Sequence, residues 1–131
     1  LDSVEVYDAQ ADSWQQVASM PQPLCYHSAA AMGGKIYVTG GLMHQTSSVD
    51  SVFVYDPQAD AWTQLASMST TRRAHTSAAV NGRLYVFGGY NTWPGGSAML
   101  GTAEAYDPAS NSWAQVTSMT SMRGKLAAVA L

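Results

Sequence analysis

An internal repeat is the feature that most constrains what this chain can fold into. The stretch "YVTGG" at 37–41 recurs as "YVFGG" at 85–89, which is 48 residues further along. When residues 4–41 are aligned with 52–89 without gaps, 20 of the 38 positions are identical. A period of about 50 residues is typical of repeats in which each unit forms one four-stranded sheet. The repeat therefore predicts an array of similar β-sheets.

Four residue types mark the repeat and occur a third time near the end of the chain. Each unit carries a Tyr-Asp pair, then a Trp, then a Met, and the Trp spacings are 48 and 51 residues. The marked residues are Tyr7, Tyr55 and Tyr106, then Asp8, Asp56 and Asp107, then Trp14, Trp62 and Trp113, and finally Met20, Met68 and Met119. Because the three aspartates stand where turns begin, we interpret them as turn residues that bond to their own backbone.

Within one unit the strand signals are short and separated by turn residues. The run at 75–80 leads into Asn81-Gly82, a dipeptide that favours the tight type I′ hairpin turn, and then into 83–89. The run at 52–56 is followed by Pro57, which cannot continue a central strand. Four such runs per unit predict an antiparallel meander, and the Ala-rich first run suits a strand crowded near a central axis.

The order of these residues resembles the kelch repeat. Its elements are a Met, an Arg four residues later, a His, a hairpin turn, "YV.GG", a variable loop, "V.VYD" and a spaced Trp, and they cover essentially the whole chain. The resemblance implies an all-β fold, a segment of a kelch-type β-propeller with four-stranded antiparallel blades around a central channel. It also implies that the binding surface lies on the face that holds two kinds of loop, those between the second and third strands of a blade and those between its fourth strand and the first strand of the next blade.

The repeat divides the chain into parts of blades. We expect residues 1–18 to form the end of one blade, 24–66 and 72–117 to form two full blades, and 123–131 to form the first strand of the next. This division predicts eleven strands, or about 2.75 blades, whereas propellers typically have four to eight. We therefore expect further blades, from the same chain or from other chains, to close the propeller. With one more strand, a two-fold pair of such chains would close six blades.

The paired glycines, Gly40-Gly41 and Gly88-Gly89, are interpreted as packing devices. Glycine permits a positive φ and lets neighbouring groups approach the backbone closely. Neither pair opens a helix in the manner of a phosphate-binding loop. The resemblance implies that Tyr55 and Trp62 pack with Gly88-Gly89 in one core unit.

Three positions depart from the repeat pattern. Leu24 stands where Arg72 and Arg123 occur, and Phe53 stands where Glu5 and Glu104 occur. These two changes predict a weaker polar network in the first full blade. In addition, Leu126 replaces the His found at 27 and 75.

Composition excludes several classes of function. The 131 residues carry six Lys and Arg scattered along the chain and a net charge of −3, which gives no electrostatic case for nucleic acid or an anionic membrane. No apolar run approaches the roughly 20 residues of a membrane span. The lone Cys25 favours a reducing compartment, and so a cytoplasmic location, over a disulfide-rich secreted one.

The histidines give no sign of a metal site or cofactor. His27 and His75 occupy the same repeat position, which favours a structural role, and His44 has no ligand partner at a suitable spacing. No spacing typical of a catalytic motif occurs. We therefore predict no cofactor, no metal and no catalytic residue.

The loops at 42–51 and 90–102 differ in length and sequence while the frame around them repeats, and such loops commonly carry binding specificity. Trp93, which lies outside the repeat frame, is the strongest candidate for a partner contact because Trp, Tyr and Arg dominate interface hot spots. Its alternative is a Trp that folds back onto its own blade. Arg72 and Arg123 fit the repeat pattern, whereas Arg73 is an additional arginine. We therefore expect Arg73 to be the arginine most free to bind an acidic peptide. The full set of predicted partner-binding residues is Trp93, Tyr90, Met99, His44, Arg72, Arg73 and Arg123.

These observations favour a non-catalytic protein–protein interaction module, as in kelch adaptors and scaffolds. One alternative is a segment of a kelch-like carbohydrate-active enzyme, either a sugar isomerase or an oxidase. Such an enzyme would need Arg, Glu and His side chains that face one ligand in the central channel. The other alternative is a structural subunit with a fixed place in a large assembly.

Overall fold

The computed structural model describes residues 2–43, 47–93 and 96–130. These residues form twelve β-strands and no helix. The strands are β1 (Val4–Asp8), β2 (Ser13–Val17), β3 (Ser28–Met32), β4 (Lys35–Met43), β5 (Ser47–Asp56), β6 (Ala61–Gln64), β7 (Thr76–Val80), β8 (Arg83–Phe87), β9 (Tyr90–Trp93), β10 (Gly96–Met99), β11 (Ala103–Asp107) and β12 (Ser112–Val116). The prediction of an all-β chain is confirmed over this part of the sequence.

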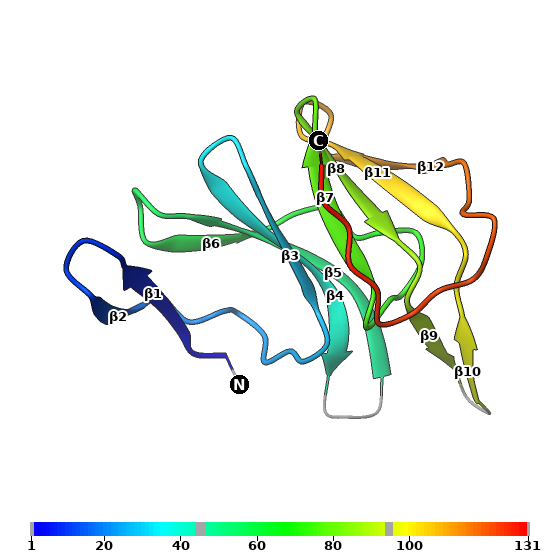
Figure 1. Ribbon diagram of the computed structural model, residues 1–131, viewed down its shortest axis with the longest axis horizontal. Helices are drawn as coiled ribbons and strands as arrows, with labels where there is room; N and C mark the ends of the chain where they lie inside the picture. Colours follow the sequence, from blue (N-terminus) through cyan, green and yellow to red (C-terminus); the bar gives the residue numbers. More distant parts are fainter. Residues whose placement is uncertain (1, 44–46, 94–95, 131) are drawn as a thin grey trace.

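Two four-stranded antiparallel sheets make up most of the molecule (Figure 1). The first blade has the strand order β3-β4-β5-β6, and the second blade has the order β7-β8-β11-β12. Strands β1 and β2 form a separate two-stranded sheet, the N-terminal hairpin, beside the first blade. The described residues therefore form part of a propeller, and their sheets do not close into a ring.

The turns at one end of the sheets follow from their sequences. Gly33-Gly34 and Asn81-Gly82 join the first two strands of each blade, and all four residues have positive φ values between 51° and 75°, as a type I′ turn requires. The aspartates at the ends of β1, β5 and β11 each accept a hydrogen bond from the backbone N–H two residues later, at 2.8, 3.0 and 2.9 Å. The predicted turn role of these aspartates is confirmed.

The repeated Tyr and Trp residues form cross-strand pairs and link each sheet to the one before it. Their ring centroids are 5.2, 5.1 and 5.2 Å apart in the pairs Tyr7–Trp14, Tyr55–Trp62 and Tyr106–Trp113. The indole N–H of Trp62 donates to the carbonyl of Ala18 at 2.8 Å, and that of Trp113 donates to the carbonyl of Ala66 at 2.9 Å. Trp62 and Trp113 thus each join their own blade to the end of the preceding sheet.

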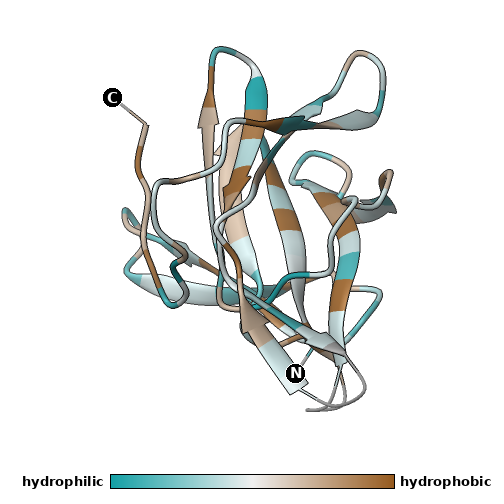
Figure 2. Cartoon of the chain, turned by 90° about the vertical axis from the view of Figure 1, so that its right-hand side faces the viewer, coloured by the Kyte–Doolittle hydropathy of each residue, from teal (hydrophilic) through white to brown (hydrophobic). Residues whose placement is uncertain are grey.

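The core lies between neighbouring sheets rather than within one. Tyr37 and Val54 of the first blade pack with Leu84 and Tyr106 of the second. The Ala-rich first strands, β3 and β7, also lie side by side, and the hydroxyls of Ser28 and Ser77 on these strands are 2.7 Å apart. In Figure 2 the apolar residues appear as bands that alternate with polar ones along the strands. This alternation is what sheets that pack face to face require.

Two segments differ from the predicted strand pattern. The predicted loop at 90–102 contains a hairpin of its own, β9–β10, which adds two strands to the predicted eleven. Residues 123–130 form no strand, although we expected the first strand of another blade there. A strand needs a hydrogen-bonded partner, and in the described residues this segment has only isolated contacts, such as the bond from Ala128 N to Thr76 Oγ1 at 3.1 Å.

Candidate binding face

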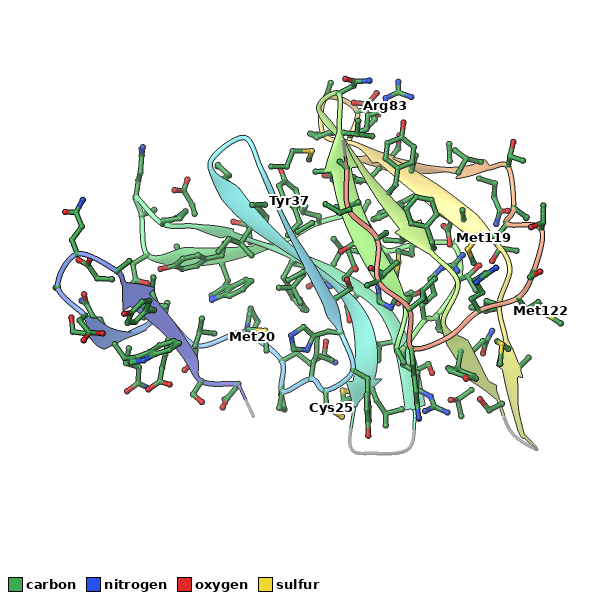
Figure 3. The ribbon with its side chains drawn as sticks, viewed as in Figure 1. Met20, Cys25, Tyr37, Arg83, Met119 and Met122 are labelled. Carbon is green, nitrogen blue, oxygen red and sulfur yellow. The ribbon has the colours of Figure 1, made fainter. Side chains whose placement is uncertain are left out.

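The two ends of the sheets differ in character. We call one end the loop face; it comprises the end of β4, the β9–β10 hairpin and the segments 24–27, 72–75 and 123–126. The opposite end, the turn face, comprises the turns at 33–34, 57–60, 81–82 and 108–111. In Figure 3, Cys25 lies at the loop face of the first blade, and Arg83 lies at the turn face of the second.

The diglycines fix the backbone of the loop face. Gly40, Gly41, Gly88 and Gly89 all have positive φ values, between 54° and 116°. Gly41 N donates to the carbonyl of Arg72 at 2.7 Å, and Gly89 N donates to the carbonyl of Arg123 at the same distance. A side chain on the first glycine of either pair would overlap that same arginine carbonyl. Each pair thus contacts the start of the next repeat unit.

The partners of the diglycines differ from those that the resemblance implied. The atoms nearest to a Cβ built on Gly88 belong to Arg123, Met119 and Leu100, and those nearest to Gly89 belong to Arg73 and His75. None of them comes from Tyr55 or Trp62, whose rings pack against each other instead, tilted by 39°. The expected single unit of Tyr, Trp and diglycine is therefore replaced by two separate contacts.

The structure assigns Arg72 to the core, which corrects its prediction as a partner contact. Its side chain is 0% exposed and its guanidinium pairs with Glu104, with Nη2 2.9 Å from Oε1. The same guanidinium donates to the carbonyls of Gly88 and Thr102 at 2.9 and 3.0 Å. The repeat pattern alone could have indicated this, because Arg and Glu are replaced together in the first blade by Leu24 and Phe53, which share an apolar cluster there.

Arg73 and Tyr90, both predicted to bind a partner, lie together. Their backbones exchange hydrogen bonds of 3.0 and 2.9 Å, and the Arg73 guanidinium lies over the Tyr90 ring, 5.7 Å from its centroid. Arg73 Nε donates to Thr92 Oγ1 at 3.1 Å and its Nη2 donates to Ser97 Oγ at 3.2 Å. The other face of the Tyr90 ring has no room for a side chain at Gly124. These contacts hold the arginine and the hairpin in one arrangement.

The β9–β10 hairpin is also attached to the first blade. The hydroxyls of Ser48 on β5 and Thr92 on β9 are 3.0 Å apart. This bond joins two blades across the loop face, so the hairpin is supported on both sides. Sequence reasoning did not find Ser48 or Ser97, because a lone serine in a loop carries no periodic signal.

A small pocket opens beside Arg73. It has a volume of about 270 Å³, and we call it the rim pocket; it is lined by Tyr26, Arg73, Ala74, Tyr90, Ser97 and Lys125. Tyr26, Ala74 and Lys125 occupy the same position in three successive repeat units, and all three have positive φ values, of 55°, 48° and 55°. Ala74 N donates to the carbonyl of Tyr26, and Lys125 N to that of Ala74, both at 2.8 Å. The pocket is therefore built by a chain of main-chain bonds that runs from unit to unit.

The other predicted partner residues lie around this pocket or outside the described part. Met99 pairs with Tyr90 in the hairpin and is 40% exposed, and the Arg123 side chain is exposed on the same face. His44 and the side chain of Trp93 lie outside what the structure describes. Sequence reasoning missed Tyr26 and Lys125, because their shared left-handed backbone is visible only in the structure.

His75 lies in the core of the same region. Its Nε2 is 2.8 Å from Thr39 Oγ1, and its buried Nδ1 has no hydrogen-bond partner among the described residues. Burial, with the nearby Arg72 charge as a second cause, lowers the pKa of His75 to about 3. The imidazole is therefore neutral at physiological pH, and its role is to bridge the two blades through Thr39.

A larger hollow, of about 740 Å³, lies elsewhere. It separates the N-terminal hairpin from the first blade and is lined by residues such as Val4, Glu5, Met20 and Val38. In the two full blades the corresponding space is occupied by the first two strands of a sheet, which the N-terminal hairpin lacks in the described residues. We interpret this hollow as the place of those strands and not as a ligand site.

Three comparisons with known proteins place the chain. The model of the KLHDC2/KLHL20/DRC7 Kelch-repeats domain matches residues 1–130. The chain belongs to the kelch-repeat family. Among solved structures, that of YjhT superimposes with a TM-score of 0.81 at 18% identity, and the match covers 91% of this chain and 46% of that one. This likeness confirms the propeller fold.

Shorter stretches of the kelch chain match curated proteins. It is 43% identical over 44 residues to Kelch repeat and BTB domain-containing protein 12 of Danio rerio and 49% identical over 39 residues to Kelch-like protein 3 of Danio rerio. It is also 42% identical over 41 residues to Kelch-like protein 33 of Homo sapiens. The matches cover 7%, 6% and 8% of those proteins, so the chain corresponds to a small part of each.

No group of three or more His, Cys, Asp or Glu side chains suited to a metal ion occurs among the described residues. In the same residues there is no helix long and apolar enough to cross a membrane.

Proposed function

We propose that this kelch segment is a non-catalytic protein-interaction module that binds another protein through its loop face. The observation that carries the proposal is the β9–β10 hairpin, which Arg73 and Ser48 anchor to two different blades and which leaves Met99 exposed and Tyr90 half-buried. A supported hairpin on a rigid frame can bind with little loss of conformational entropy. The kelch relatives, one of which has a BTB domain in its name, agree with such a role.

The enzyme alternative lacks the observation that would favour it. A channel-facing cluster for a sugar would have to use the Arg and His positions near the first strands. Arg72 and His75 are instead buried and bonded to Glu104 and Thr39. The assembly-subunit alternative involves the same loop face and differs only in the permanence of the partner. We keep the expectation of a reducing compartment such as the cytoplasm, which rests on the lone Cys25.

The test is affinity capture by the full-length protein with matched surface variants. Met99→Ser removes an exposed apolar side chain, 40% accessible, from the loop face, and Val80→Ser removes one that is 37% accessible near the turn face. We expect the Met99 variant to lose specific partners that the Val80 variant retains. Equal partner sets for both variants would show that the loop face is not the binding surface. Trp93→Ala, made alongside, tests the separate prediction that this residue contacts the partner.

A further inference from the structure

The two edges of the β9–β10 hairpin differ in what covers them. The edge formed by β9 is covered, because the backbones of Tyr90 and Arg73 exchange hydrogen bonds and the hydroxyl of Ser48 lies 3.0 Å from that of Thr92. Strand β10 pairs with β9 and with no other strand among the described residues. In Figure 1, β9 lies between β5 and β10, so β10 forms the outer edge of the hairpin.

The register of the hairpin shows which main-chain groups of β10 point outward. Met99 lies opposite Tyr90, and the next N–H, that of Leu100, donates to the carbonyl of Gly89 at 2.8 Å. In an antiparallel pair this bond makes Met99 and Tyr90 a non-hydrogen-bonded pair, and Ser97, two residues earlier, belongs to another such pair. The N–H and C=O groups of Ser97 and Met99 therefore point away from β9. They have no main-chain partner on that side among the described residues.

Strand β10 lacks the features that protect edge strands from pairing. Soluble proteins commonly protect such edges with charged side chains, with proline or with a β-bulge. The sequence of β10 is Gly-Ser-Ala-Met, and its register with β9 is regular. Ser97 and Met99 are exposed, and the small side chains at 96–98 allow another backbone to approach. Arg73 does not obstruct the edge, because its guanidinium lies over the Tyr90 ring and contacts the side chain of Ser97.

The first blade shows what kind of neighbour such an edge receives in this molecule. The carbonyls of Val49 and Leu100 each accept a hydrogen bond of 3.0 Å from the start of the next repeat unit, so Ser48 corresponds to Met99. Ser48 lies beside β9, an extended strand outside its own sheet, and bonds to it through its hydroxyl. At Met99 no described strand occupies this place. The edge of one hairpin is therefore covered by an extended chain, and the corresponding edge of the next is open to one.

We propose that the free edge of β10 binds an extended segment of the partner protein by β-strand addition. The inference rests on the proposed function and specifies how the partner is held at the loop face. Ser97 and Met99 each offer one N–H and one C=O, so an added strand can form up to four main-chain hydrogen bonds with them. The residue of the added strand opposite Met99 lies on the same side of the sheet as the Met99 side chain, so an apolar residue suits that position.

A segment of a partner protein fits this edge better than a second copy of the chain does. Strand β10 has four residues, which corresponds to a length of about 14 Å. Two copies joined only along this strand would bury far less than the roughly 1,200–2,000 Å² of a stable interface. A partner can add side-chain contacts along the rest of the loop face to the main-chain bonds at β10. The edge then fixes the path of the segment, and the side chains around it select its sequence.

The experiment is an NMR titration of the ¹⁵N-labelled full-length protein with two hexapeptides. The first probe is acetyl-Thr-Val-Thr-Val-Thr-Val amide, whose residues favour an extended backbone, and the second is the same peptide with every residue N-methylated, which removes its backbone donors. We expect the first probe to cause saturable shifts and slower hydrogen exchange at the Ser97 and Met99 amides, and the second to cause neither.

Three results would overturn the proposal. The first is the absence of saturable binding, or shifts confined to other surfaces. The second is slow exchange of the Ser97 and Met99 amides before any peptide is added, which would show that another part of the same protein covers the edge. The third is a dimer of the free protein that Ser97→Pro dissociates, which would assign the edge to a second copy.

Matched variants at one position isolate the main-chain donor. Ser97→Pro removes the outward N–H and leaves the bonds between β9 and β10 in place, since an edge strand tolerates proline. Ser97→Ala removes the hydroxyl and keeps the N–H. We expect Ser97→Pro to raise the dissociation constant of the first probe by at least about five-fold and Ser97→Ala by less than about two-fold.

Equal effects of the two variants would refute strand addition. Met99→Pro repeats the test at the other outward residue, and unchanged shifts outside the hairpin show that each variant is folded. If partner capture depends on Met99 in the test of the proposed function while neither proline variant weakens binding of the probe, this inference fails and the proposed function stands.

Discussion

Replacement of Arg72 by leucine tests whether the Arg72–Glu104 pair stabilises the second blade. Arg72 and Glu104 are both fully buried, so the change leaves a carboxylate in the core without its cation. Breaking a buried ion pair by removing one partner costs about 3–5 kcal/mol. We expect Arg72→Leu to reduce the free energy of unfolding by an amount in this range.

The hydrogen bonds of the guanidinium explain why Arg72→Leu should reduce the free energy of unfolding by more than most single substitutions do. Arg72 donates five hydrogen bonds, two to Glu104 Oε1, one to Gly88 and two to Thr102, at 2.9 to 3.3 Å. After the change Glu104 keeps only the bonds that Ser69 donates to Oε2, at 2.8 and 2.7 Å. The carbonyls of Gly88 and Thr102 also lose a donor.

A second substitution separates the cost of the unpaired Glu104 charge from the rest of the loss of stability. In the first blade the same two positions hold Leu24 and Phe53, which pack with Met20 and Val38. The double variant Arg72→Leu with Glu104→Phe copies this apolar pair into the second blade and leaves no buried charge. We expect it to recover at least half of the lost stability, since about 1–2 kcal/mol remains for the unpaired backbone and Ser69 groups.

The assay is equilibrium urea unfolding followed by tryptophan fluorescence, with Arg83→Leu as the control. Arg83 pairs with Asp107 at 3.4 Å on the surface, where such pairs contribute about 0–1 kcal/mol. Two results would refute the reasoning. One is a loss for Arg72→Leu no greater than for Arg83→Leu, and the other is a double variant no more stable than the single one.

Three further predictions concern the frame of the sheets, and each is measured by the same unfolding assay. Gly88→Ala should cost about 3 kcal/mol, because φ is +60° and a Cβ would overlap Arg123, whereas Gly82→Ala, at φ +73° in open space, should cost about 1 kcal/mol; equal costs would contradict the packing role. Trp62→Phe should cost about 1 kcal/mol more than Trp14→Phe. Of these two residues, only Trp62 donates its indole N–H to a main-chain carbonyl among the described residues, at 2.8 Å. The reverse order would rule out a stabilising contribution from this hydrogen bond. Since the folded-state pKa of His75, about 3, is below its usual value, stability should fall as the pH falls from about 6.5 towards 3, by about 2–3 kcal/mol at pH 4.5. His75→Leu should flatten that part of the profile, and an unchanged profile would exclude His75 as its cause.

The repeat frame was predictable because every element of it has a local signal. Tight turns need Gly, Asn or Asp, and strands that pack between sheets need alternating apolar residues, so these features recur at a fixed spacing. The positive φ values at Gly40 and Gly88 and the turn bonds of Asp56 were expected on this basis and are confirmed. Each of these predictions depends on a few residues that are close together in the chain.

The parts that were not predicted depend on contacts between distant residues. The β9–β10 hairpin does carry the turn residues Pro94-Gly95-Gly96, but Ser48 and Arg73, which support it, lie in other strands and segments. The burial of Arg72 depends on Glu104, 32 residues further along the chain. Such arrangements follow from how the sheets pack against each other. A single sequence read by itself does not reveal that packing.

Leu24 and Phe53 connect the folding of the repeat to its use as a scaffold. We predicted that these residues weaken the polar network of the first blade, and in the structure they form an apolar cluster in the place of an ion pair. The frame therefore accepts either a charged or an apolar pair, provided that both members change together. The positions of Arg73 and Lys125 show no such partner change, since Cys25, Gly124, Tyr26 and Ala74 occur there on an unchanged backbone. Residues that vary singly on a constant frame are free to be selected for contact with a partner, whereas the paired positions beneath them are tied to stability.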